Sequence, residues 1–166
     1  ALGGGDRRSI GRSNRVVQQV LSDRRLMAEI MRGLRVDDAV VRMRCADIAE
    51  KVSRIQPDWL LSYQKTLLGL IRSATQQELR WHLAQMAPRL KLTARQRASV
   101  TNKLTVYLSD DSRIVRVCAM QALAEFAAKD PRLRRRVVPM LGAMKSRGAP
   151  SSRARARQLL RWLAHQ

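Results

Sequence analysis

Apolar side chains recur along the chain at intervals of three and four residues, the spacing that places them on one face of an α-helix. Within residues 41–52, for example, Val41, Cys45, Ile48 and Val52 would form one buried stripe. A second amphipathic stretch precedes each such helix, over residues 14–34, 57–73, 93–108 and 130–145. No segment shows the sustained two-residue alternation that predicts a strand, so we expect an all-α fold.

Four segments of the chain resemble one another. Each approximates an apolar residue, an arginine, two variable residues, a small residue, two more variable residues and two apolar residues. Their arginines are Arg42, Arg80, Arg116 and Arg153, which lie 38, 36 and 37 residues apart. A period of this length is typical of helical solenoids, in which stacked repeats bury a continuous core. We therefore expect about four antiparallel helical hairpins, near residues 14–54, 57–90, 93–128 and 130–165.

Turn and capping residues agree with these boundaries. Asp130 stands directly before a proline, which places a side-chain acceptor ahead of a first-turn proline. Asp37–Asp38 and Asp110–Asp111 should open the second helices of their hairpins, where carboxylates meet free backbone N–H groups. Pro88 should end or kink its helix, and residues 147–150 should form the last turn between helices.

The pattern resembles the HEAT-repeat family over residues 23–163. Val41–Arg42 and Val115–Arg116 match the Val-Arg pair of its second helices, and Asp38 and Asp111 match the acidic residue that precedes this pair. The resemblance implies a right-handed α-solenoid. It implies little about activity, because such solenoids serve as transport receptors, phosphatase scaffolds, chromosome proteins and, in a few families, enzymes.

The resemblance also suggests how the chain is divided. Residues 14–166 are expected to form a single HEAT-like domain, and residues 1–13 a flexible N-terminal segment. Ala1–Gly5 lacks an initiator methionine and an apolar signal core, so we expect a trimmed end. The fourth repeat has no acidic residue before Arg153, and we expect it to be a cap that turns a polar arginine stripe to water.

The repeated polar positions have a structural and a functional interpretation. The structural one is that the arginines bond acidic partners and helix-end carbonyls of neighbouring repeats, while the aspartates cap helices. The alternatives are that the arginines bind phosphate and that the carboxylate pairs do acid–base chemistry or bind Mg²⁺. We favour the structural interpretation for Arg42, Arg80, Arg116, Arg153, Asp38 and Asp111.

Charge suggests what the protein binds. The chain carries 33 Lys and Arg against 13 Asp and Glu, a net charge of +20, yet its 45% hydrophobic content suffices for a packed core. Residues 130–166 hold ten basic residues and one acidic residue. Arginine predominates, and its planar fork suits bidentate contacts with carboxylate or phosphate. A solvated basic face without a ligand remains an alternative interpretation.

In solenoids of this type the second helices line the inner, concave surface, which would put basic and amide side chains where a partner binds. The residues expected to contact a partner come from these helices and from the basic C-terminal repeat: Arg44, His82, Arg89, Arg132, Arg134, Arg135, Arg136, Arg155, Arg157 and Arg161.

The side chains most often used in catalysis are scarce. Cys45 and Cys118 lie two repeats apart, too far for a disulfide, so both should be free thiols, Cys45 inert and Cys118 facing outward. With only His82 and His165 and no closely spaced cysteine pair, no metal site, cofactor or catalytic residue is predicted. The two cysteines suggest a reducing intracellular compartment, cytoplasmic or nuclear, and no apolar run approaches the length of a membrane span.

A weaker similarity links the chain to HEAT-like alkylpurine DNA glycosylases. That family places a tryptophan and an aspartate one helical turn apart in a basic groove, and Trp81 and Gln85 have this spacing. The acid is absent at Gln85, so the match supports DNA contact better than base excision. Packing between hairpins is the other interpretation of Trp81.

Three functions therefore stay open. The first is a non-catalytic HEAT-repeat scaffold or adaptor that binds an acidic protein or peptide segment through a basic surface. The second is a solenoid that binds nucleic acid through phosphate contacts, with little base readout because aromatic residues are few. The third, least favoured, is an enzyme similar to the glycosylases.

Overall fold

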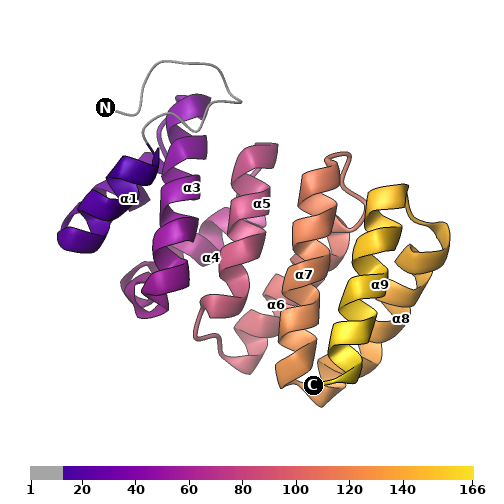
Figure 1. Ribbon diagram of the computed structural model, residues 1–166. Helices are drawn as coiled ribbons and strands as arrows, with labels where there is room; N and C mark the ends of the chain where they lie inside the picture. The colour runs from indigo at the N-terminus through magenta and orange to yellow at the C-terminus, as the bar shows by residue number, and fades with distance from the viewer. Residues whose placement is uncertain (1–12) are drawn as a thin grey trace. The chain divides into compact units, whose positions relative to one another are not determined.

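The computed structural model describes residues 13–166, and all regular structure in this range is helical, with no strand (Figure 1). The prediction of an all-α fold is confirmed. The expected flexible segment lies outside the described residues except for Ser13, which is the first residue of a helix. The chain divides into two compact units, Ala1–Lys91 and Leu92–Gln166, and each is described separately.

Unit 1 is built around its longest helix. Its elements are α1 (Ser13–Ser22), α2 (Leu26–Gly33), α3 (Ala39–Ile55), the 3₁₀ helix η1 (Pro57–Tyr63), α4 (Gln64–Ser73), α5 (Gln77–Met86) and the 3₁₀ turn η2 (Ala87–Arg89). Helix α3 contacts α1, α2, η1 and α5, and Figure 1 shows it between α1 and α5. The core between these helices includes Leu34, Ile48, Leu60 and Leu67, all fully buried.

The first amphipathic stretch, residues 14–34, is two helices rather than one. The break falls at Asp23, whose carboxylate accepts hydrogen bonds from the backbone N–H of Arg25 at 3.0 Å and from its guanidinium at 2.9 Å. This local turn competes with the helix, as short acidic side chains commonly do. The stretch at residues 57–73 is also divided, because it starts as η1 and continues as α4.

Unit 2 consists of α6 (Ala94–Tyr107), α7 (Arg113–Lys129), α8 (Pro131–Arg147) and α9 (Pro150–Ala164). Helix α7 contacts the other three, and α8 also contacts α9. Leu104, Met120, Leu123 and Leu141 are buried in the core that these helices share.

Most of the helix ends lie where the sequence predicts them. Asp130 caps α8 by accepting from the backbone N–H of Arg132 at 2.9 Å, and Asp38 caps α3. Helix α5 ends before Pro88, and α8 ends at Arg147, with Gly148 as its C-cap. Asp111 is an exception: the cap of α7 is Ser112, so the predicted capping position was wrong by one residue.

The repeated arginines occupy one helical register. Each is the fourth residue after the N-cap of its helix, and these N-caps are Asp38, Gln76, Ser112 and Ala149. Three of the arginines donate from their guanidinium groups to carbonyls of the loop just before their own helix: Arg42 to Val36, Arg80 to Thr75, and Arg116 to Asp110 and Asp111. Arginine at this position therefore stabilises the loop that precedes its own helix. From the sequence, the bonded carbonyls were instead expected to come from neighbouring repeats. Arg42 also bonds Gln76, at the start of α5.

Helices α2 and α3 approach closely at Gly33. A Cβ atom at this position would overlap the Sγ of buried Cys45 and lie 3.3 Å from its Cβ. Gly33→Ala is therefore expected to lower the free energy of unfolding by about 1–2 kcal/mol, because an added methyl group overpacks the contact. Chemical denaturation would measure this loss. Adding Cys45→Ala should restore most of the lost stability, because it removes the Sγ atom that the new methyl group overlaps. If the double variant is no more stable than Gly33→Ala, this overlap is not the cause of the loss.

Candidate polyanion-binding surface

Three predicted surface residues on the second helices are buried. Arg44 is 3% exposed, and His82 and Cys118 are each 9% exposed. They share one register, six residues after the N-caps of α3, α5 and α7. In unit 1 this row lies where α3 and α5 pack together. Arg44 and His82 therefore do not lie on an exposed surface, as their prediction as partner contacts required, and the outward placement of Cys118 was wrong.

Arg89 is also engaged within the protein. Its guanidinium donates to the Glu50 carboxylate at 2.9 Å and to the Ser53 hydroxyl at 2.8 Å. The Glu50 side chain is only 2% exposed, so this pair links η2 to the buried side of α3. Arg89 therefore has a structural role in unit 1.

Burial determines the titration of His82. Loss of solvent lowers the pKa of the imidazole, and the Lys51 charge lowers it further, whereas Asp47 and Glu50 act in the opposite direction. The folded state therefore binds the His82 proton less readily than the unfolded chain, in which histidine titrates near pH 6.5. As the pH falls below that value, the unfolded state gains the proton first and the folded state loses relative stability.

We expect the free energy of unfolding to decrease between about pH 7 and pH 5, with part of this decrease due to His82. Denaturation of wild type and His82→Asn across this range would measure it, and the variant should show the shallower slope. His165→Asn alters the exposed histidine and is the control. Equal slopes for wild type and His82→Asn would contradict the assignment.

The thiol of Cys45 is inert, as the sequence suggested. Burial raises its pKa to about 11, so the nucleophilic thiolate is scarce at neutral pH. Cys45 and Cys118 are both buried, and neither forms a disulfide within residues 13–166. No group of three His, Cys, Asp or Glu side chains within residues 13–166 could hold a metal ion.

Two predicted partner-binding arginines of unit 2 make internal contacts. Arg134 donates to the backbone carbonyl of Leu163 and so ties α8 to the end of α9. Arg155 donates to the side chains of Gln121 at 2.6 Å and Gln158 at 3.1 Å. Both arginines are half-buried and support the packing of α9.

The other five predicted residues of unit 2 are exposed: Arg132, Arg135, Arg136, Arg157 and Arg161. They do not form one cluster. Arg136 reaches Asn102 of α6 at 3.4 Å, and Arg132 shares its side of α8 because the two lie four residues apart. Arg157 and Arg161 lie on α9, one helical turn apart.

The exposed α9 arginines line a hollow between α8 and α9. We call it the terminal hollow, and its lining residues are Lys145, Arg157, Leu160 and Arg161. Lys145 and Leu160 were not among the residues expected to contact a partner. Arg157 and Arg161 were, and together with Arg153 they also formed the polar stripe expected of a terminal cap. Helices α8 and α9 contain no Asp or Glu, so no acidic residue of either helix offsets this charge.

The pair that carries the glycosylase similarity is partly buried. Trp81 is half-buried, and its ring centroid lies 5.4 Å from that of His82. Gln85 is also half-buried and lies close to His82. These contacts agree with the packing interpretation of Trp81.

A comparison of the sequence with models of protein families found no match, and a comparison with curated proteins found none either. Within residues 13–166, no helix is both long and apolar enough to cross a membrane.

Proposed function

We propose that the chain is a non-catalytic scaffold of HEAT-like repeats, arranged as a right-handed solenoid, that binds an acidic protein segment through the terminal hollow. The shared register of the arginines in α3, α5, α7 and α9 supports the repeat. The side-by-side contacts of α3 with α5 and of α7 with α9 support stacking within each unit.

The main support for binding is the isolated positive charge of the terminal hollow. Lys145, Arg157 and Arg161 are exposed around one depression, and none of them makes an ion pair within residues 13–166. Like charges placed together without acidic partners repel one another, and an anionic ligand would relieve this repulsion. Leu160 in the lining offers an apolar contact that suits a peptide.

Nucleic acid is the second candidate. Arg132, Arg135 and Arg136 extend the exposed charge along the rest of α8, which would suit a long phosphate backbone better than a short peptide. Binding of this kind should weaken steeply as salt rises, because condensed counterions are released from the nucleic acid.

The experiment compares a fluorescent poly-glutamate peptide with fluorescent duplex DNA across a salt series. The test variant combines Lys145→Ala, Arg157→Ala and Arg161→Ala, and it leaves Arg134 in place because Arg134 holds α9. The matched control removes three other exposed cations of unit 2, by Arg95→Ala, Arg113→Ala and Lys129→Ala. We expect the test variant to lose at least about tenfold in peptide affinity and the control less than about twofold.

The outcomes separate the candidates. Peptide binding that depends on the terminal hollow at physiological salt would support the scaffold. Tight, salt-steep DNA binding that is lost on substituting Arg132, Arg135 and Arg136 would overturn it in favour of nucleic acid. Equal losses in the test and control variants would show that net charge alone drives binding, and would remove the terminal hollow as a site.

A further inference from the structure

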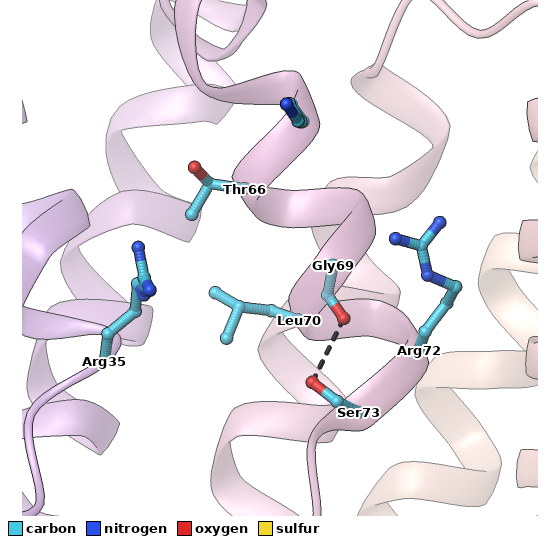
Figure 2. Close-up of a pocket in the computed structure, with 7 residues that line it drawn as sticks. Arg35, Thr66, Gly69, Leu70, Arg72 and Ser73 are labelled. Carbon is cyan, nitrogen blue, oxygen red and sulfur yellow. Dashed lines mark hydrogen bonds between the residues drawn. The ribbon is translucent and has the colours of Figure 1, made fainter.

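Unit 1 contains a second basic hollow, on the face of α4. This α4 hollow is an open depression with a volume of about 430 Å³. Figure 2 shows Arg35 across a gap from Thr66 and Leu70, with Arg72 on the other side of the same helix. Its lining includes Arg35, Lys65, Thr66, Gly69, Leu70 and Arg72.

The positive charge of the α4 hollow is only partly offset nearby: Asp37 and Asp38 follow Arg35 in the sequence, and Asp38 caps α3. Arg35, Lys65 and Arg72 are all exposed, and none of them makes an ion pair within the described part of the chain. Residues 59–77 contain no Asp or Glu. The nearest acidic residue before this stretch, Asp58, pairs with Lys91 at 3.0 Å. Arg35, Lys65 and Arg72 are therefore accessible to an anionic ligand.

Gly69 keeps the surface of the α4 hollow open. It lies inside a helix, where glycine is less favourable than alanine, and a Cβ at this position would meet nothing within 4 Å. Packing therefore does not require glycine here. Gly69 lines the α4 hollow together with Leu70 and Arg72, and Figure 2 shows all three on this helix.

The same local sequence recurs two repeats later. Residues 69–73 read Gly-Leu-Ile-Arg-Ser, and residues 142–146 read Gly-Ala-Met-Lys-Ser. Both glycines lie seven residues before the N-cap of the next helix, and a Cβ at either would meet nothing within 4 Å. In each case the serine hydroxyl donates to the glycine carbonyl, at 3.1 Å and 3.2 Å. The basic residue lines the α4 hollow in the first and the terminal hollow in the second.

An adjoining depression adds apolar surface. It has a volume of about 220 Å³, shares Arg35 and Thr66 with the α4 hollow, and is also lined by Ala28, Met31 and Tyr63. Its remaining cation, Arg32, is paired with Glu29. The two depressions therefore offer a basic half and an apolar half side by side. A peptide with aliphatic side chains next to its carboxylates fits this combination better than a phosphate backbone does.

We infer that the α4 hollow is a second binding site, which takes an acidic peptide segment whose carboxylates contact Arg35, Lys65 and Arg72 while an adjacent aliphatic side chain enters the apolar half. The site lies in unit 1, and the inference does not depend on the function proposed for the terminal hollow.

The experiment uses the full chain carrying the three terminal-hollow substitutions, so that only the second site is measured. The probe is a fluorescent peptide of about ten residues that alternates glutamate with leucine, compared with one that has serine in place of leucine. Combining Arg35→Ala, Lys65→Ala and Arg72→Ala should lower the affinity for the leucine peptide at least about tenfold. The serine peptide should bind about tenfold more weakly than the leucine peptide.

Gly69→Leu is the sharper variant, because it should fill the α4 hollow without harming the helix. Its Tm should equal or exceed that of the parent chain, since leucine favours the helix, while the affinity should fall at least about tenfold. Gly142→Leu is the matched control at the same register in unit 2, and it should leave the affinity unchanged.

The inference would be overturned by normal binding to Gly69→Leu, by equal binding of the two peptides, or by binding of duplex DNA but not of peptide. The inference would also be overturned if the chain carrying the terminal-hollow substitutions bound no peptide at all. The proposed function would be unaffected by that result. If those substitutions have no effect and Gly69→Leu abolishes binding, the proposed function fails and the α4 site remains.

Discussion

Replacing Arg89 by alanine is expected to lower the free energy of unfolding by about 2–3 kcal/mol. Arg89 contacts the carboxylate of Glu50, whose side chain is 2% exposed, and the hydroxyl of buried Ser53. The substitution would remove one of the positive charges that stabilise the buried Glu50 carboxylate. The carboxylate could then regain hydration only if the structure opened. Urea denaturation of the two proteins would measure the difference.

Arg54→Ala is the matched control, because Arg54 contacts the same carboxylate at 2.7 Å. The Arg54 side chain is 57% exposed and the pair spans one helical turn, so its loss should cost only about 0.3–0.5 kcal/mol. A cost for Arg54→Ala equal to that for Arg89→Ala would contradict the role of burial. Replacing Glu50 and Arg89 together by leucine and methionine should recover much of the loss, since no buried charge would remain.

The helices could be predicted from the sequence because their signals are local. Apolar spacing identifies the helical stretches, and Asp38, Asp130 and Pro88 mark ends that depend on neighbouring residues alone. The repeated arginines identify a register that holds in all four helices concerned. The break at Asp23 was missed because the residues around it are compatible with a helix. Its three hydrogen bonds with Arg25 compete with the helical backbone bonds.

The candidate site was predictable only in part, because exposure depends on residues distant in the sequence. Arg44, His82 and Arg89 have side chains typical of a binding surface. Their burial follows from the packing around α3, and Arg89 meets Glu50 across 39 residues of sequence. A pattern of neighbouring residues in the sequence therefore cannot predict the contact between Arg89 and Glu50.

Arg157 and Arg161 were predicted correctly as exposed residues, because an arginine stripe at four-residue spacing lies opposite the apolar face of its own helix. The two hollows were not predicted. Each depends on residues from separate elements, such as Lys145 of α8 beside Arg157 of α9. For the α4 hollow, a signal was present in the sequence: a glycine inside a helix followed three residues later by a basic residue, repeated at Gly142.

Leu141→Ala is expected to lower the free energy of unfolding by about 3 kcal/mol, the largest effect among the single substitutions considered. Leu141 is completely buried, on the face of α8 that also carries Leu133 and Val137. Removing its side chain loses apolar burial and leaves a cavity among helices that contact one another. Stability of a typical domain is only about 5–15 kcal/mol, so the loss should appear as a clear fall in Tm.

Val138→Ala is the control on the same helix. Val138 is 36% exposed, and alanine is the better helix former, so this variant should stay within about 0.5 kcal/mol of wild type. Because Lys145 is held in place by α8, Leu141→Ala should also weaken peptide binding at temperatures where unit 2 begins to unfold, while Val138→Ala should not. Equal stability of the two variants would contradict the packing of α8, and loss of binding by Val138→Ala would show that α8 contacts the ligand beyond the terminal hollow.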